Sequence, residues 1–351
     1  MIWVLNIATV SAHPKMNGEP AVTDRVKQSL REAFSKQDYY EAHQIYKSLN
    51  FRYQRLKRFD ELADILYSGS MDFFRLNTTQ SGIDLARQFA EILEKGNLAV
   101  SDARVQQIAT LYREVPRDPE SERAIFLGSV LTWSVNHNPE SKAGHVAIHA
   151  AVARICWEEQ NYPSAVYHFV RAMDPVTLAK VLHDLYDNRD EIRETKGKKD
   201  DPYTFGELDN AQEYDQRLVA IAVIEFLALN RHDLAKLLFT EYISRHRNPE
   251  IRNTLYNFRV LALISALLSV CSTTEPGSEG EFTKLQAALC GVFPDNSRIE
   301  KLLTSVGQIY LNIKPAGGPL QSIFAMFKKD SVPVSQPETK PDAMHHDLDF
   351  D

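Results

Sequence analysis

The sequence has little of what most catalytic sites are built from. Its 351 residues include three cysteines and 14 glycines. No Gly-x-x-x-x-Gly-Lys-Ser/Thr loop is present to hold a phosphate, and no Gly-x-Ser-x-Gly elbow is present to expose a nucleophile. Acidic pairs such as Glu158-Glu159 fit solvated faces rather than a buried acid–base site. We therefore expect no enzymatic activity and no cofactor.

The cysteines also lack the spacing of a metal site or a disulfide framework. Cys156, Cys271 and Cys290 lie far apart, each within an apolar stretch. Unpaired cysteines are common in reducing compartments and are commonly buried. We expect each to be a small core residue in a cytosolic protein.

Positive charge and long apolar runs are missing as well. The formal net charge is −7, so the chain lacks the overall basicity that attracts phosphate backbones. The apolar run Val260–Cys271 is shorter than the roughly 20 residues of a membrane span, and the apolar start of the chain has no basic region before it. These features predict no nucleic-acid partner and no direct membrane insertion.

Most of the chain has the periodicity of α-helices. Between Val22 and Phe327 apolar residues recur at intervals of three and four, with polar breaks every 15 to 20 residues. The segment from Tyr39 to Tyr53 and the segment from Asp60 to Phe74 each carry one apolar face. The breaks between helices are short, which predicts that consecutive helices run antiparallel.

One short sequence pattern recurs along the chain. It is an aromatic residue followed three or four positions later by alanine, as in Tyr39–Ala42, Phe59–Ala63 and Tyr162–Ala165. Small residues at these places let paired helices approach closely, as they do in tetratricopeptide arrays. We predict an all-α fold, an irregular, tetratricopeptide-like α-solenoid of antiparallel helix pairs.

Composition divides the chain into five segments. We expect a disordered leader over residues 1–21 and an N-terminal helical-repeat half over 22–193. A charged, Gly/Pro-punctuated loop covers 194–208, and a C-terminal helical half covers 209–328. Residues 329–351 are acidic and contain proline, which predicts a disordered tail.

Two side-chain groups are candidates for function. Arg52, Arg55, Lys57 and Arg58 are interleaved with Phe51, Tyr53 and Phe59, a composition typical of binding surfaces; the alternative is a solvated turn. His145 and His149 have the i, i+4 spacing of zinc ligands, but Val146 stands where a zinc protease has its glutamate. The alternative for this pair is a structural role.

Several blocks, in order and at matching intervals, resemble one known family. They are Tyr39–Gln44, Phe51–Tyr53, Tyr67–Phe74, Trp157–Tyr162 with Tyr167–Phe169, and Val306–Tyr310 before Pro315. From about Arg25 to Phe327 the chain is similar to the Golgi-to-ER traffic protein 4 family, the scaffold of the guided entry pathway for tail-anchored membrane proteins. The resemblance implies a two-part α-solenoid without catalytic activity.

The resemblance also implies two partners. The N-terminal half would dock the cytosolic ATPase that carries tail-anchored clients, and the C-terminal half would hold a ubiquitin-like adaptor. Candidate ATPase contacts lie in the first helices: Tyr40, His43, Arg52, Arg55, Arg58 and Asp60. For Tyr40 and Ala42, packing of the first helix pair is the alternative. The acidic overall charge would attract a partner with a basic docking face.

For the adaptor we expect a surface between Leu218 and Ile313. The apolar helices there exceed what one helix pair needs to bury, which predicts an exposed groove for an amphipathic helix. Candidate contacts are Leu218, Phe226, Phe258, Leu261 and Ile264. The amphipathic segment Pro319–Phe327 suits either a cap on the solenoid or a partner contact.

Two other functions stay open at this stage. One is a helical-repeat subunit of another large complex, which would explain the solenoid but not the ordered family blocks. The other is a metalloenzyme using His145 and His149.

Overall fold

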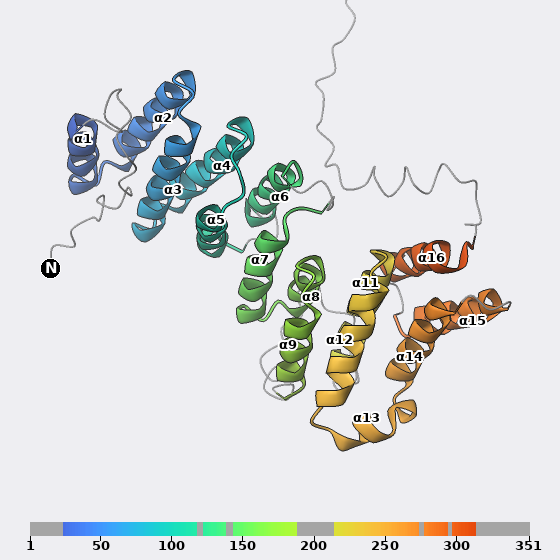
Figure 1. Ribbon diagram of the computed structural model, residues 1–351. Coiled ribbons are helices and arrows are strands. Elements are labelled where there is room, and N and C mark those ends of the chain that lie inside the picture. Colours follow the sequence, from blue (N-terminus) through green and yellow to red (C-terminus); the bar gives the residue numbers. More distant parts are fainter. Residues whose placement is uncertain are drawn as a thin grey trace, which may run out of the picture.

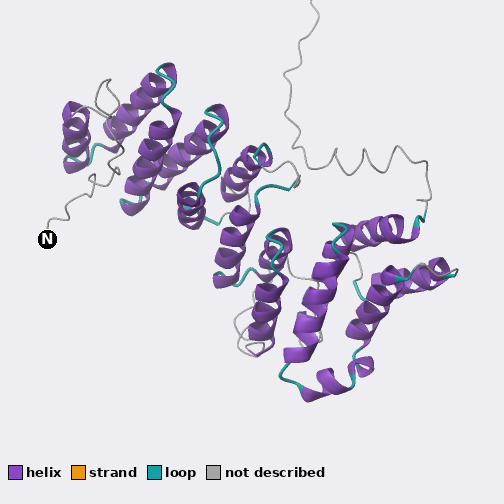
Figure 2. Cartoon of the chain, in the orientation of Figure 1, coloured by secondary structure: helices purple, strands orange, loops and turns teal. Residues whose placement is uncertain are grey.

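The computed structural model describes residues 24–117, 122–137, 143–187, 214–273, 277–293 and 297–313. Throughout these ranges the regular secondary structure is helical and contains no strand (Figure 2), which confirms the all-α prediction. The predictions for residues 1–21, 194–208, Pro319–Phe327 and 329–351 lie outside the described residues. Among the helices that the structure describes, none combines the length and apolarity needed to cross a bilayer.

The helices follow one another through short turns. The first group is α1 (Asp24–Ser35), α2 (Tyr39–Arg55), α3 (Phe59–Arg75), α4 (Thr79–Lys95), α5 (Asp102–Glu114), α6 (Glu122–Val135), α7 (Val146–Glu158), α8 (Tyr162–Arg171) and α9 (Pro175–Asp187). The second group is α11 (Tyr214–Ala228), α12 (His232–Arg245), α13 (Pro249–Asn253), the 3-10 helix η2 (Leu255–Asn257), α14 (Arg259–Ser272), α15 (Ser278–Cys290) and α16 (Ser297–Leu311).

The turns of the first group share one geometry. Gln37, Lys57, Asn77 and Asn97, spaced 20 residues apart, all have positive φ angles. After α2, the amide of Arg58 donates to the carbonyl of Tyr53 and the amide of Lys57 donates to that of Gln54, each over 3.0 Å. This pair of bonds is the Schellman motif, which satisfies the last carbonyls of a helix and reverses the chain. Because α2, α3 and α4 each contain 17 residues, the repeat is regular here.

Small residues allow these helices to pack closely, as the sequence predicts. Ala42, Ala63 and Ala165 are completely buried. Gly69 in α3 has a similar role, because a Cβ atom there would lie 2.5 Å from the ring of Tyr46. The structure therefore confirms antiparallel pairs held by contacts that have no room for a larger side chain.

The paired helices stack into an elongated array with α1 at one end and α14 to α16 at the other (Figure 1). In the second group α11 packs against five other helices: α8, α9, α12, α14 and α16. One hydrophobic core runs through both groups, from Leu30 to Val306. Cys156 and Cys271 are buried in this core as predicted, and Cys290 is partly buried.

Candidate partner-binding interface

The α2 helix presents two opposite faces. Ala42, Tyr46, Leu49 and Tyr53 form its buried face. Tyr40 and Phe51 are 76% and 72% exposed, and because they are 11 residues apart, about three helical turns, they share the opposite side. The side chains of Arg52 and Arg55 are exposed near the end of the same helix. We call Tyr40, Phe51, Arg52 and Arg55 the α2 surface.

The structure separates Tyr40 from Ala42, for both of which packing of the first helix pair was the alternative to partner binding. Ala42 is fully buried and packs the helix pair, whereas Tyr40 points to solvent. Exposed tyrosine, phenylalanine and arginine side chains of this kind are common in protein interfaces, where they supply much of the binding energy. Sequence reasoning identified Tyr40, Arg52 and Arg55, and named Phe51 within the aromatic cluster.

The other three candidates of this region form polar contacts, His43 and Asp60 with neighbouring helices and Arg58 with the first turn of α3. His43 Nε2 lies 2.8 Å from the carboxylate of Asp84 in α4. Arg58 Nε donates to Glu61 over 2.6 Å. Asp60 accepts from Arg104 of α5 over 2.7 Å. The first pair joins α2 to α4, the second lies at the start of α3, and the third joins α3 to α5. A cavity of about 230 Å³ lies beside the α2–α3 turn, lined by Lys57, Arg58, Phe59, Asp60, Glu61, Gly96 and Leu98.

Charge at this end of the array is opposite to that of the whole chain. Residues 24–58 contain nine lysines and arginines but four aspartates and glutamates, a local net charge of +5 against −7 overall. A partner steered to the α2 surface should therefore present an acidic face. The expectation of a partner with a basic face, drawn from the overall charge, stays a prediction, and this local charge does not favour the α2 surface as its place.

The C-terminal candidates have a different environment. Leu218, Phe226, Leu261 and Ile264 are at most 1% exposed. The prediction that they line an exposed groove is wrong, because α11 and α14 are covered by their neighbours and bury their apolar residues in the shared core. Phe258 is half-buried at the start of α14 and is the one candidate of this set that reaches the surface.

His145 and His149, considered above as a pair of zinc ligands, do not form a pair in the structure. His145 precedes α7 as its N-cap, and its Nδ1 accepts from the amide of Ala147 over 3.3 Å. His149 lies in the core, where its Nδ1 is 2.8 Å from Nδ1 of His168. Its Nε2 donates to the carbonyl of Ala143 over 3.1 Å. The two imidazoles at 145 and 149 therefore serve separate structural contacts, and the described residues hold no group of three or more metal-ligating side chains.

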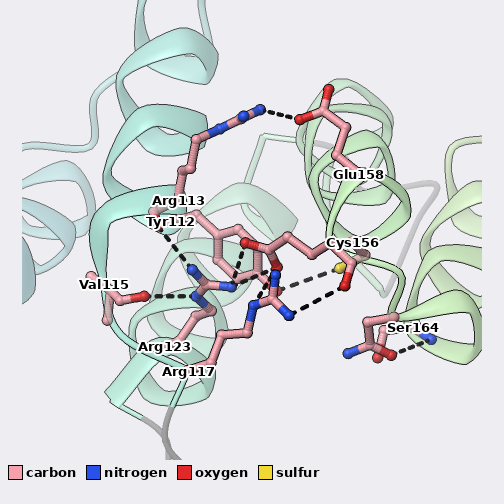
Figure 3. Close-up of polar contacts among 10 residues, drawn as sticks. Tyr112, Arg113, Val115, Arg117, Arg123, Cys156, Glu158 and Ser164 are labelled. Atoms are coloured by element: carbon pink, nitrogen blue, oxygen red, sulfur yellow. Dashed lines mark hydrogen bonds and ion pairs between the residues drawn. The ribbon is translucent and has the colours of Figure 1, made fainter. Parts of the chain in front are cut away.

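Buried charges connect the repeats, and sequence reasoning missed them. Arg123 of α6 donates to the carbonyls of Val115 and Arg113 over 2.8 and 2.9 Å and to Glu159 over 2.8 Å (Figure 3). One guanidinium thus satisfies the carbonyl end of α5 and binds the end of α7. Arg104 likewise links two helices, since it lies in α5 and contacts the carboxylates of Asp60 and Asp64 in α3.

A third buried charge joins the two groups of helices. Glu225 of α11 accepts from Arg171 of α8 over 3.0 Å and also from Arg298 of α16. The guanidinium of Arg171 stacks on the ring of Tyr167, 3.3 Å from its centroid. The sequence does carry a signal for this site, because Glu225 is the single charged residue within the apolar run Leu218–Leu229.

These features define an irregular α-solenoid, a class of protein whose exposed faces bind other proteins. The family model described as Golgi to ER traffic protein 4 matches residues 56–327, and the chain belongs to this family. The human Golgi to ER traffic protein 4 homolog is 28% identical over 339 residues, 93% of each chain. The homolog from Xenopus tropicalis is 29% identical over 331 residues, 90% of this chain and 92% of its own.

A solved structure shares the fold. The crystal structure of C. therm. Get4 superposes with a TM-score of 0.60 at 19% identity, covering 90% of this chain and 98% of that one. The array of helix pairs seen here is therefore a known architecture.

Proposed function

We propose that this chain is a non-enzymatic cytosolic scaffold in the targeting of tail-anchored membrane proteins to the ER. In this role it bridges a targeting ATPase and a ubiquitin-like adaptor. The proposal combines membership of a Golgi to ER traffic family with the partners implied by the family resemblance. The observation that carries it is the α2 surface, an aromatic and basic face left exposed at the end of an elongated array.

The ATPase binds at the α2 surface in this proposal. Tyr40 and Phe51 would be its aromatic anchors, since truncating such anchors commonly costs about 2 kcal/mol, or roughly 30-fold in affinity. Arg52 and Arg55 would bind acidic side chains of the ATPase and speed its association at low salt. His43, Arg58 and Asp60 would act through the contacts that hold this edge of the array.

The adaptor binds in the second group of helices. Because Leu218, Phe226, Leu261 and Ile264 are buried, they support this interface by packing α11 and α14 rather than by touching the adaptor. Phe258 remains a candidate contact. The separation of the two surfaces along the array is what would let one chain hold both partners at once.

Charge reversal tests the first interface. The variant Arg52→Glu/Arg55→Glu should weaken binding of the purified targeting ATPase at least about tenfold while leaving the adaptor bound. The matched control is Arg154→Glu/Lys180→Glu, which makes the same charge change at exposed positions of α7 and α9. Binding is measured by isothermal titration calorimetry at 50 and 300 mM salt. Equal ATPase affinity for both variants and the unaltered chain would remove the α2 surface from the proposal.

A further inference from the structure

A second exposed surface lies at the corner between α12 and α14, away from the α2 surface. Tyr256 of η2 is 82% exposed, more than any other large hydrophobic side chain in the described residues. Arg252 precedes it by four residues and Arg259 follows it by three, and both are exposed. We call these three residues the η2 corner.

The two arginines of the η2 corner differ from their neighbours. Arg245 and Arg247 are each held by a carboxylate 2.9 Å away, from Glu241 and Asp187 respectively. Arg252 and Arg259, in contrast, form no ion pair with any residue that the structure describes. The corner thus presents two guanidinium groups and a phenol ring to solvent, which suits an acidic segment with apolar side chains.

The backbone of the η2 corner is well fixed. Asn248 caps α13 by accepting from the amide of Glu250 over 2.9 Å. Ile251 is 1% exposed and anchors α13 in the core. The amide of Thr254 donates to Glu250 over 2.7 Å at the end of that helix. A surface held in this way loses little conformational entropy when it binds a peptide.

We propose that the acidic segment His345–Asp351 of the same chain docks on the η2 corner. This segment lies outside the described residues. Its sequence alternates aspartate with apolar residues: Asp347, Leu348, Asp349, Phe350 and Asp351. In an extended peptide, residues two apart share a side, so one side would carry carboxylates toward Arg252 and Arg259. Leu348 or Phe350 would cover Tyr256.

The position of α16 allows the segment His345–Asp351 to reach the η2 corner. His232 lies against Tyr310 of α16, with ring centroids 6.1 Å apart, and also contacts the carbonyl of Leu268 over 3.1 Å. The end of α16 is therefore beside Leu268 of α14. Arg259 begins that helix nine residues earlier, about 14 Å away along the axis at 1.5 Å per residue.

Asp347 follows Ile313 by 34 positions in the sequence. A flexible linker of this length would have a root-mean-square span of about 30 Å. The η2 corner lies within that span, whereas the α2 surface is at the opposite end of the array (Figure 1). Effective concentration is greatest when linker length matches the separation of the sites, which favours the η2 corner over the α2 surface.

Arginine-specific labelling of the full chain with phenylglyoxal tests this docking. Neutralising the segment by Asp347→Asn/Asp349→Asn/Asp351→Asn should speed labelling of Arg252 and Arg259 by about threefold to tenfold, as read by mass spectrometry. Arg55 on α2 is the internal control and should not change. Unaltered labelling of Arg252 and Arg259 overturns the proposal, and faster labelling of Arg55 in their place shows that the segment docks on α2.

Two further readouts identify the occupant. If labelling of the unaltered chain slows with increasing protein concentration, a second copy supplies the segment and docking in cis is wrong. Hydrogen exchange of residues 345–351 should accelerate in Arg252→Glu/Arg259→Glu and slow again when Asp347→Lys/Asp349→Lys is added. Failure of this charge exchange to restore slow exchange, with helix content unchanged by circular dichroism, also overturns the proposal.

Discussion

The two ends of this array use apolar residues in opposite ways. At the α2 end, helices of equal length pack on one face and leave Tyr40 and Phe51 in solvent. In the second group, α11 is surrounded by five helices, and most of its apolar side chains are buried in the shared core. The number of neighbouring helices, rather than apolar content, therefore decides whether a side chain can meet a partner.

The largest expected effect tests this contrast directly. Phe226→Ala removes a fully buried ring and should lower the free energy of unfolding by about 3–5 kcal/mol. Phe51→Ala removes the same atoms from an exposed site and should change stability by less than about 0.5 kcal/mol. Urea denaturation followed by circular dichroism measures both. Similar losses in the two variants would mean that α11 is not enclosed as described.

Glu225→Ala tests the junction between the two groups of helices. It leaves the partly buried Arg171 without its carboxylate, and we expect a loss of about 3 kcal/mol in the same measurement. The matched control is Glu158→Ala, which breaks an ion pair with Arg113 whose side chains are more than half exposed. That control should cost less than about 1 kcal/mol. A loss for Glu225→Ala no larger than the control's contradicts the role of Glu225 as a junction.

Acid should weaken the region between the two ends. Burial lowers the pKa of His149 to about 4 and that of His168 well below its ordinary value. As the pH falls below about 6.5, the unfolded chain takes up protons that the folded chain does not, so stability falls. We expect His149 alone to cost about 1.5 kcal/mol between pH 6.5 and pH 5.

Urea midpoints at the two pH values measure this loss. In His149→Leu/His168→Leu, the dependence on pH over this interval should be smaller than in the unaltered chain, whatever the change in stability itself. The same dependence in both proteins would show that these histidines do not titrate in the way their burial requires.

The smallest effect concerns the regular turns of the α2 end. Lys57 has a φ angle of +57°, a conformation that glycine adopts without strain. Lys57→Gly should raise the thermal midpoint, with a gain of about 0.5–1 kcal/mol. At Asn77, with φ of +56°, the corresponding gain should be smaller because asparagine tolerates this conformation. A loss of stability in Lys57→Gly would show that the positive φ angle of Lys57 does not strain the folded chain.

Much of the fold could be predicted from local pattern alone. The polar breaks and the alanines at 42, 63 and 165 indicate antiparallel pairs because they report contacts between helices adjacent in sequence. Burial in the second group depends on α8 and α16, which lie far from α11 in sequence, so no local pattern there separates a groove from a core. His145 was expected on the same helix face as His149. The helix begins one residue later, at Val146, so the side chain of His145 caps it instead.

The candidate site shows the same difference between residues indicated by local sequence and contacts made between helices. Tyr40, Arg52 and Arg55 were candidates because of the aromatic and basic composition of their segment and the family resemblance, and the structure shows that all three are exposed on α2. Arg123 and Glu159 were not found, because their contact joins α6 to α7 across a turn whose path the sequence does not specify. Family resemblance supplied the partners, which the physical properties of the surface do not name.

The central claim is that one chain bridges two partners, and sedimentation velocity with the purified ATPase, adaptor and full chain tests it most directly. The account predicts that ATPase and adaptor sediment together only when the chain is present, and that Arg52→Glu/Arg55→Glu releases the ATPase while the adaptor stays bound. Displacement of one partner by the other on the unaltered chain would contradict the bridge.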